Sequence, residues 1–299
     1  HIITDLKETF RRGNIFIQLI YINVSIFIIG TLINVFLQLF QHSIPDIFGI
    51  FALPASFIRF FHQPWSIITY MFMHAGLLHI LFNMLWLYWF GSLFLHFFSA
   101  KHLRGLYILG GILGGLLYMV AYNVFPLFNQ EVAVSTLVGA SASVLAIVAA
   151  TAYREPNYRV QLFLFGAIRL KYLALVVIGI DVLSITSSNA GGHIAHLGGA
   201  LAGLWFAASL SKGTDLTSWI NWILDGFTSL FQKKTWKRKP KMKVHYGNSA
   251  TGREKDYDYN AHKKAQSDEV DRILEKLKKS GYDSLTTEEK KSLFDASKR

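Results

Sequence analysis

The sequence predicts an all-α polytopic membrane protein, a bundle of six transmembrane helices followed by a small helical tail on the cytoplasmic side. Hydrophobic residues make up 52% of the 299-residue chain, and aromatic residues make up 15%. Residues 13–211 contain only eleven Asp, Glu, Lys or Arg residues, so most of the charge lies in the two ends of the chain. Such long, nearly uncharged stretches are typical of membrane spans.

Six apolar runs lie between the charged loops. We expect transmembrane helices at about residues 15–37, 77–94, 104–122, 141–152, 170–185 and 193–210. The range 41–65 is aromatic but contains three prolines, which predicts a loop lying partly in the membrane interface. The membrane core is therefore predicted at residues 15–211, after an amphipathic lead-in at residues 1–14.

Lys and Arg tend to remain on the cytoplasmic side of short loops. The loops on one side of the six predicted spans hold nine basic residues, which are Arg11, Arg12, Lys101, Arg104, Arg154, Arg159, Arg169, Lys171 and Lys212. The loops on the other side hold Arg59 together with Asp46 and Glu131. Both termini are therefore predicted to be cytoplasmic, and residue 141 is predicted to open towards the outer side.

Residues 212–243 are predicted to form an interfacial helix and a basic linker. Apolar residues recur at helical spacing over 216–231, opposite a polar face of Asp215, Asn221 and Asp225. Seven Lys or Arg residues follow in 233–243, and they predict binding to anionic lipid, although a simple stop-transfer flank has the same composition. The net charge of +11 lies in these flanking regions, which favours a lipid partner over nucleic acid.

The last part of the chain is polar. Residues 244–266 are predicted to be a disordered linker, and residues 267–299 a small helical hairpin. In the hairpin, an apolar stripe precedes Gly281, and Thr286 with Glu289 has the spacing of a capping box. No chemistry is indicated there.

Ser141 begins one of the apolar runs. In the first turn of a helix, free backbone N–H groups and the positive end of the helix dipole favour developing negative charge. Ser141 is therefore a candidate nucleophile. The small residues at 139–143 also fit a structural role, the close packing of two membrane helices.

Four further polar side chains lie within or beside the predicted spans. They are His74, His79, Asn83 and His196. Polar groups in a membrane are functional candidates, although hydrogen bonding between helices is an alternative. His79 and Asn83 are four residues apart and share a helix face.

Ser141 and His196 are predicted to lie at similar depth, about 20 and 24 Å from the cytoplasmic ends of their helices. The fourth span is too short to cross the bilayer, so a wet cavity is expected above it. A serine and a histidine at one depth in such a cavity could act as nucleophile and base. Gly199 and Gly203 would let another helix approach closely.

Three short motifs occur in order along the chain: His79-x-x-x-Asn83, Gly139-x-Ser141 and Ala195-His196-x-x-Gly199-x-x-x-Gly203. On a six-span frame with both termini inside, residues 15–211 resemble the rhomboid family of intramembrane serine proteases, of the bacterial type with a C-terminal cytoplasmic extension. The chain departs from the common pattern at Ala142, where Gly is usual, and at Leu145, where an aromatic residue is frequent.

The resemblance implies that Ser141 is the nucleophile and His196 the general base, without a carboxylate as third member. It implies an oxyanion hole formed by the Ser141 backbone N–H and the side chains of His79 and Asn83. The supporting residues that it implies are Gly139, His74, Gly199, Gly203 and Trp65. Of these, His74 is expected to be structural and Trp65 to lie in the membrane-embedded first loop.

Two readings of other polar residues remain open. Asp181, in the fifth span, could reach His196 and complete a triad, or it could be protonated or hydrogen-bonded for structure. A metal site built from His74, His79, His193 and His196 is a separate reading that the absence of cysteine and of a helical His-Glu pattern disfavours. We predict no metal and no cofactor.

The resemblance implies an enzyme that cleaves single-span membrane proteins in or near their transmembrane segment through an acyl-enzyme. It also implies a multi-pass location, in the bacterial cytoplasmic (inner) membrane. The alternative is a non-catalytic superfamily member that binds and guides transmembrane helices. Such relatives usually lack the serine or the histidine, and this chain has both.

Overall fold

The computed structural model describes residues 13–40, 47–162, 166–231 and 250–297. It divides into two compact units, residues 1–233 and 234–299, which are considered separately below. Residues 1–12 of the predicted lead-in, the basic residues 233–243 and residues 244–249 of the predicted linker lie outside the described residues.

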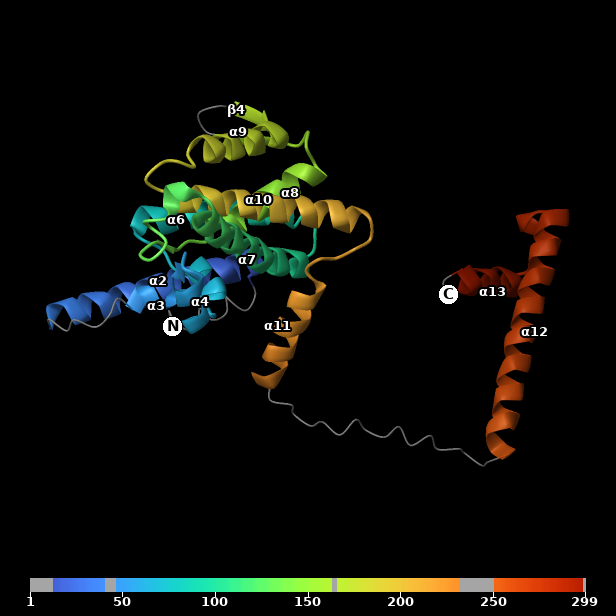
Figure 1. Ribbon diagram of the computed structural model, residues 1–299. Helices are drawn as coiled ribbons and strands as arrows, with labels where there is room; N and C mark the ends of the chain where they lie inside the picture. Colours follow the sequence, from blue (N-terminus) through green and yellow to red (C-terminus); the bar gives the residue numbers. More distant parts are fainter. Residues whose placement is uncertain (1–12, 41–46, 163–165, 232–249, 298–299) are drawn as a thin grey trace. The chain divides into compact units, whose positions relative to one another are not determined.

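The first unit is a helical bundle (Figure 1). Each of the six predicted ranges is helical, with ends within a few residues of those expected. The helices are α2 (Ile15–Leu39), α6 (Leu77–Phe94), α7 (Ala100–Val124), α8 (Ser141–Arg154), α9 (Leu170–Leu183) and α10 (Ala190–Ser211). Of these, α2, α6, α7 and α10 are long and apolar enough to cross a membrane. The prediction of a polytopic helical membrane protein is therefore confirmed.

Helices α8 and α9 have 14 residues each. At 1.5 Å per residue each is about 21 Å long, which is shorter than the roughly 30 Å hydrocarbon core. The count of six spans therefore remains a prediction. The two helices differ in burial, because α8 is buried along most of its length whereas α9 buries only Leu170, Ala174 and Asp181.

The core of the bundle is formed by α7, α8 and α10, which lie against one another (Figure 1). Glycines make this contact possible. A Cβ added at Gly199 would overlap the carbonyl oxygen of Ala142, and one added at Gly203 would overlap that of Ala146. The backbones of α8 and α10 therefore touch, as the Gly-x-x-x-Gly spacing predicts.

The loop between the first two spans contains short ordered elements instead of irregular chain. These are α3 (Ile47–Phe51), β1 (Leu53–Pro54), α4 (Phe57–His62), α5 (Ser66–Thr69) and the 3₁₀ helix η1 (Tyr70–Phe72). Ile58 and Phe61 of α4 are each 76% exposed, which suits a segment in contact with lipid. The predicted interfacial loop thus has the expected exposed apolar surface.

A short antiparallel strand pair ties this loop to the chain before α8. Strand β1 pairs with β2 (Thr136–Leu137), with Leu53 opposite Leu137. In the sequence, the 3₁₀ helix η2 (Pro126–Phe128) lies between α7 and β2. The strands β3 (Arg159–Leu162) and β4 (Gly166–Arg169) form an antiparallel hairpin that leads into α9.

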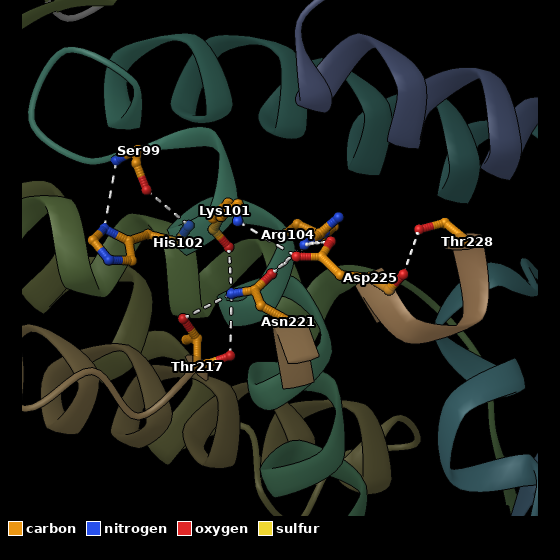
Figure 2. A network of polar contacts seen from close by, with 8 residues as sticks. All are labelled: Ser99, Lys101, His102, Arg104, Thr217, Asn221, Asp225 and Thr228. Carbon is orange, nitrogen blue, oxygen red and sulfur yellow. Dashed lines mark hydrogen bonds and ion pairs between the residues drawn. The ribbon is translucent and has the colours of Figure 1, made fainter. Parts of the chain in front are cut away.

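Helix α11 (Ser218–Phe231) follows α10 and confirms the predicted helix after the last span. Its polar residues bind the beginning of α7 (Figure 2). The Arg104 guanidinium donates to Asn221 Oδ1 at 2.8 and 2.9 Å and to Asp225 Oδ1 at 2.8 Å, while Asn221 Nδ2 donates to the Lys101 carbonyl at 3.0 Å. The guanidinium holds the pKa of the Asp225 carboxyl below its ordinary value. The polar face of α11 is thus partly a docking face.

The second unit is a helical hairpin of α12 (Ala250–Ser280), η3 (Tyr282–Ser284) and α13 (Thr287–Ser297). The predicted capping box is present, since the Thr286 N–H donates to Glu289 Oε2 at 2.8 Å and the Glu289 N–H donates to Thr286 Oγ1 at 3.3 Å. Lys276 contacts Glu289 at 2.9 Å and joins the two helices. Gly281 has φ +76°, which fits its position after α12.

The prediction of a disordered linker over 244–266 is wrong for residues 250–266, which are helical. This stretch contains no proline and one glycine, and Ala, Lys, Glu and Gln favour a helix even without an apolar stripe. Because the apolar stripe begins only at Val270, the hydrophobic period could not indicate the first turns of α12.

The close contact of α8 and α10 predicts a large difference between two glycine substitutions. Gly203→Ala would force a methyl group against the Ala146 carbonyl, and we expect it to lower the free energy of unfolding by on the order of 1–3 kcal/mol. The matched control is Gly179→Ala in α9, where a Cβ would meet nothing within 4 Å. Thermal unfolding in detergent measures both. Equal melting temperatures of the two variants would contradict the close contact of α8 and α10.

Candidate active site

A cavity of about 400 Å³ opens within the bundle, lined from α6, α8, α9 and α10. Four polar residues predicted from the sequence line it together: Ser141, His196, His79 and Asn83. The remaining lining is largely apolar and comprises Leu78, Phe82, Trp86, Val138, Val144, Leu145 and Val177, with Asn189 and Gly192. An apolar cavity with a few convergent polar groups is the common form of a substrate site.

Ser141 is the first residue of α8, so its backbone N–H is free of the intrahelical ladder. The residue two before it, Gly139, has φ +130° and donates its N–H to the Tyr70 carbonyl at 3.0 Å. A Cβ on Gly139 would lie 2.9 Å from two ring atoms of His79 and 3.7 Å from Ser141 Oγ. Glycine is required here both by the backbone angle and by the nearby imidazole.

The hydrogen bonds of His79 fix which ring nitrogen can donate. The Ala75 backbone N–H donates to His79 Nδ1 at 3.3 Å, so we assign the proton of the neutral ring to Nε2. This nitrogen lies beside Gly139. Asn83 Nδ2 donates one hydrogen bond to the His79 carbonyl at 2.9 Å and has a second N–H that this bond does not use. Both side chains can therefore supply donors near Ser141.

His196 lies on α10, at the part of the helix that packs against α8. Its Nδ1 is 2.9 Å from Asp181 Oδ1, and the Nδ1 of His193 is 2.8 Å from the same oxygen. Ser141 and His196 line one cavity, but no hydrogen bond joins them among the described residues. Catalytic hydrogen bonds are often long in the free state and shorten when substrate binds.

The two departures from the family pattern are both accommodated. The Ala142 methyl faces α7, where a Cβ on Gly114 would lie only 2.6 Å from it, so the extra methyl of Ala142 is matched by a glycine. Leu145 is 5% exposed and lines the cavity with His196, in the place where an aromatic residue was expected.

The two supporting aromatic residues lie outside the cavity lining. His74 is buried, and its ring centroid is 5.1 Å from that of His79 in an edge-on arrangement. Burial lowers the pKa of the His74 imidazole to about 4, so this ring is neutral at physiological pH. Trp65 is 48% exposed and donates its indole N–H to the Ile50 carbonyl at 3.0 Å, within the first loop. His74 thus packs against His79, which lines the cavity, and Trp65 binds within the first loop.

The side chains that could hold a metal ion are not the four histidines of the metal-site hypothesis. Among the described residues, Asp181, His193 and His196 place ligand atoms within 4.8 Å of one another, and His74 and His79 are not part of this group. Asp181 was predicted as a possible triad member and His193 as a possible metal ligand, without a contact between them. Their common link to His196 could have been suspected because His193 and His196 are three residues apart and share a helix face.

Two protein-family models and two curated relatives match parts of the chain. The Rhomboid domain family model matches residues 62–213, and a family of unknown function, DUF6576, matches residues 253–299. RHOMBOID-like protein 12, mitochondrial, of Arabidopsis thaliana is 29% identical over 157 residues, which are 50% of this chain and 47% of the relative. Presenilin-associated rhomboid-like protein A, mitochondrial, of Danio rerio is 30% identical over 139 residues, 45% of this chain and 34% of the relative.

The chain thus spans about half the length of the first relative and a third of the second. The rhomboid match covers 152 of the 299 residues and includes α6 to α10, the elements that line the cavity. On this match, and with its helical membrane bundle, the chain belongs to the rhomboid family.

Proposed function

We propose that this protein is an intramembrane serine endopeptidase that cleaves single-span membrane proteins in or near their transmembrane segment. The observation that supports this most is that Ser141 and His196 line one largely apolar cavity, together with the donors His79 and Asn83. A serine needs a base to become a nucleophile at neutral pH, and His196, which lines the same cavity, is the candidate for that base.

In the proposed reaction, Ser141 Oγ attacks the scissile carbonyl carbon while His196 Nε2 accepts the hydroxyl proton. The carbonyl oxygen becomes an oxyanion that accepts hydrogen bonds from the Ser141 N–H, His79 Nε2–H and Asn83 Nδ2–H. The C–N bond then breaks, and the leaving amine takes the proton from His196. Water, deprotonated by His196, hydrolyses the resulting ester and releases Ser141.

The walls of the cavity support a transmembrane substrate. They are apolar on α6, α8 and α9, so they suit hydrophobic side chains next to the scissile bond. A peptide in a continuous helix has its carbonyls in hydrogen bonds, and the substrate must unwind locally to expose one to Ser141. We therefore propose cleavage close to a helix-weakening residue, with lateral entry from the bilayer.

We further propose that anionic lipid is a partner at the cytoplasmic side. Trp222 and Leu230 of α11 are 76% and 79% exposed, and α11 is held to α7 by its polar face, so its apolar face is free for the membrane. The basic residues that follow in the sequence would add attraction to anionic headgroups. Deleting residues 232–299 should lower activity in anionic liposomes and leave it unchanged in neutral ones. If the full-length and the deleted protein were equally active in anionic liposomes, this partner would be contradicted.

Which membrane holds the protein is part of the same proposal. The topology with both termini cytoplasmic and the cavity open to the other side rests on the distribution of Lys and Arg. A bacterial cytoplasmic membrane receives no support from the two relatives, whose names place them in mitochondria. Fractionation of the native host, with protease accessibility of each terminus, tests both the compartment and the orientation.

Substitutions of the two reacting groups test the proposed chemistry directly. Ser141→Ala removes the nucleophile and His196→Ala removes the base, so each should abolish cleavage of a single-span substrate in liposomes, by at least about 10³-fold. The melting temperature of Ser141→Ala should stay near that of the wild type, since only a hydroxyl group is lost. His196→Ala also takes a hydrogen-bond partner from the buried Asp181, so its activity is compared at equal folded fraction. If Ser141→Ala retained both cleavage and biological effect, the non-catalytic helix-binding alternative would replace the protease.

Substitutions of the proposed oxyanion donors test their role in the same way. His79→Ala and Asn83→Ala should each lower kcat by about 10- to 10³-fold with little change in KM, because their hydrogen bonds form mainly in the transition state. Steady-state kinetics in liposomes measure the two constants. The control is Phe82→Leu on the same helix, which also lines the cavity but carries no donor. An equal loss of kcat in the control would contradict the assignment.

A further inference from the structure

Three ionisable side chains form a compact cluster beside the cavity. The Asp181 side chain on α9 is only 5% exposed, and its Oδ1 lies 2.8 Å from His193 Nδ1 and 2.9 Å from His196 Nδ1. The other carboxyl oxygen, Oδ2, is buried without a hydrogen-bond partner among the described residues. One oxygen of one carboxylate therefore contacts two imidazoles, including that of His196, which lines the cavity with Ser141.

The two distances, 2.8 and 2.9 Å, fit an ionised Asp181 that accepts a hydrogen bond from each Nδ1–H. A protonated Oδ1 could donate to one ring nitrogen and accept from the other, so the ionised form is assigned as part of the proposal below. Two Nδ1–H groups can both donate to an ionised carboxylate, which satisfies every contact. His196 then has its proton on Nδ1, and its Nε2 is an acceptor. This is the protonation state that a general base for Ser141 requires.

A metal ion explains the cluster less well than these hydrogen bonds do. Zinc ligands lie about 2.0–2.2 Å from the metal, so two ligands of a tetrahedral site are roughly 3.3 Å apart. The two measured separations between Asp181 and the histidines are shorter, at 2.8 and 2.9 Å. They are ordinary lengths for charge-assisted hydrogen bonds.

A purely structural link between α9 and α10 also explains the cluster of Asp181, His193 and His196 less well than a role in catalysis does. A neutral side chain could make such a link, whereas a buried carboxylate with one oxygen unpaired is costly to keep. The negative charge has a use only if positive charge develops nearby. That happens when His196 accepts the proton of Ser141.

We propose that Asp181 is a positioning residue for His196, the third member of a Ser-His-Asp arrangement, and that His193 fixes the carboxylate by donating to the same oxygen. This inference rests on the proposed protease function. The carboxylate holds the His196 imidazole with Nε2 towards the cavity and stabilises the imidazolium formed during attack. Asp181 does not take up the proton itself.

The test is Asp181→Asn in liposomes with a single-span substrate. Asn has nearly the same size and can still accept a hydrogen bond, but it lacks the charge and also allows the wrong tautomer of His196. We expect kcat to fall by about 10²- to 10⁴-fold with KM within about threefold of the wild type. Labelling of Ser141 by a fluorophosphonate should slow in parallel, while the melting temperature changes little.

Two further comparisons separate charge from packing. Asp181→Glu and Asp181→Gln have the same length and differ in charge, so at equal folded fraction the Glu variant should be at least tenfold more active. The comparison of Asp181→Glu with Asp181→Gln tests the role of the charge even if Asp181→Asn does not fold. His193→Asn keeps an N–H donor near the carboxylate, and it should retain activity within about tenfold of the wild type.

The outcomes distinguish the inference from the function on which it rests. If Ser141→Ala is inactive but Asp181→Asn keeps the wild-type kcat, the positioning role is overturned and the protease stands. A raised KM with unchanged kcat would likewise overturn it, as would equal activity of the Glu and Gln variants. Loss of wild-type activity in EDTA, restored by zinc alone, would show a metal site instead. If Ser141→Ala remains active, the protease function itself fails.

Discussion

The contact between the backbones of α8 and α10 is the constraint on which the rest of the site depends. Gly199 and Gly203 have no side chain to separate the two helices, and the carbonyls of Ala142 and Ala146 occupy the space that a Cβ would need. In a membrane there is little hydrophobic drive for helices to associate, so such close packing supplies much of the attraction. It also sets the distance between the helix of Ser141 and the helix of His196.

The other groups of the site are placed by contacts that surround this pair. Gly139 gives the chain the positive φ that it needs before α8 and leaves space for the His79 ring, whose Nδ1 is already occupied by the Ala75 N–H. The strand pair β1–β2 joins the first loop to the chain leading to this glycine. Local backbone geometry thus positions the donors, while long-range packing positions the nucleophile and histidine.

Much of this arrangement could be predicted from the sequence. Uninterrupted apolar runs predicted all six helices within a few residues, because a membrane span requires a fixed length and little charge. Ser141 and His196 were matched by their depth, by the Gly199 and Gly203 spacing and by the family motifs, and both line one cavity with His79 and Asn83. Periodicity and length are properties of a single helix, so single-helix features were the predictable ones.

Features that depend on pairs of distant segments could not be predicted in the same way. No local pattern indicates that His193 and His196 both contact one oxygen of Asp181, since the aspartate lies on a different helix. Helix α11 was predicted to lie on the membrane surface, but its sequence did not indicate that Asn221 on its polar face binds the beginning of α7. The helix over residues 250–266 lacks an apolar stripe, and only the favourable composition supports it.

The burial of α8 has a consequence for how the protein enters its membrane. Nearly every residue from Ala142 to Ala152 is enclosed by protein, and the helix is about 21 Å long and rich in alanine. Such a segment gains little from lipid, because alanine contributes far less to insertion than leucine or phenylalanine does. Its partner α10 is translated after it. The nucleophile-bearing helix therefore depends on a later segment of the chain for its enclosure, which makes completion of the last span the step that commits the site to the bilayer.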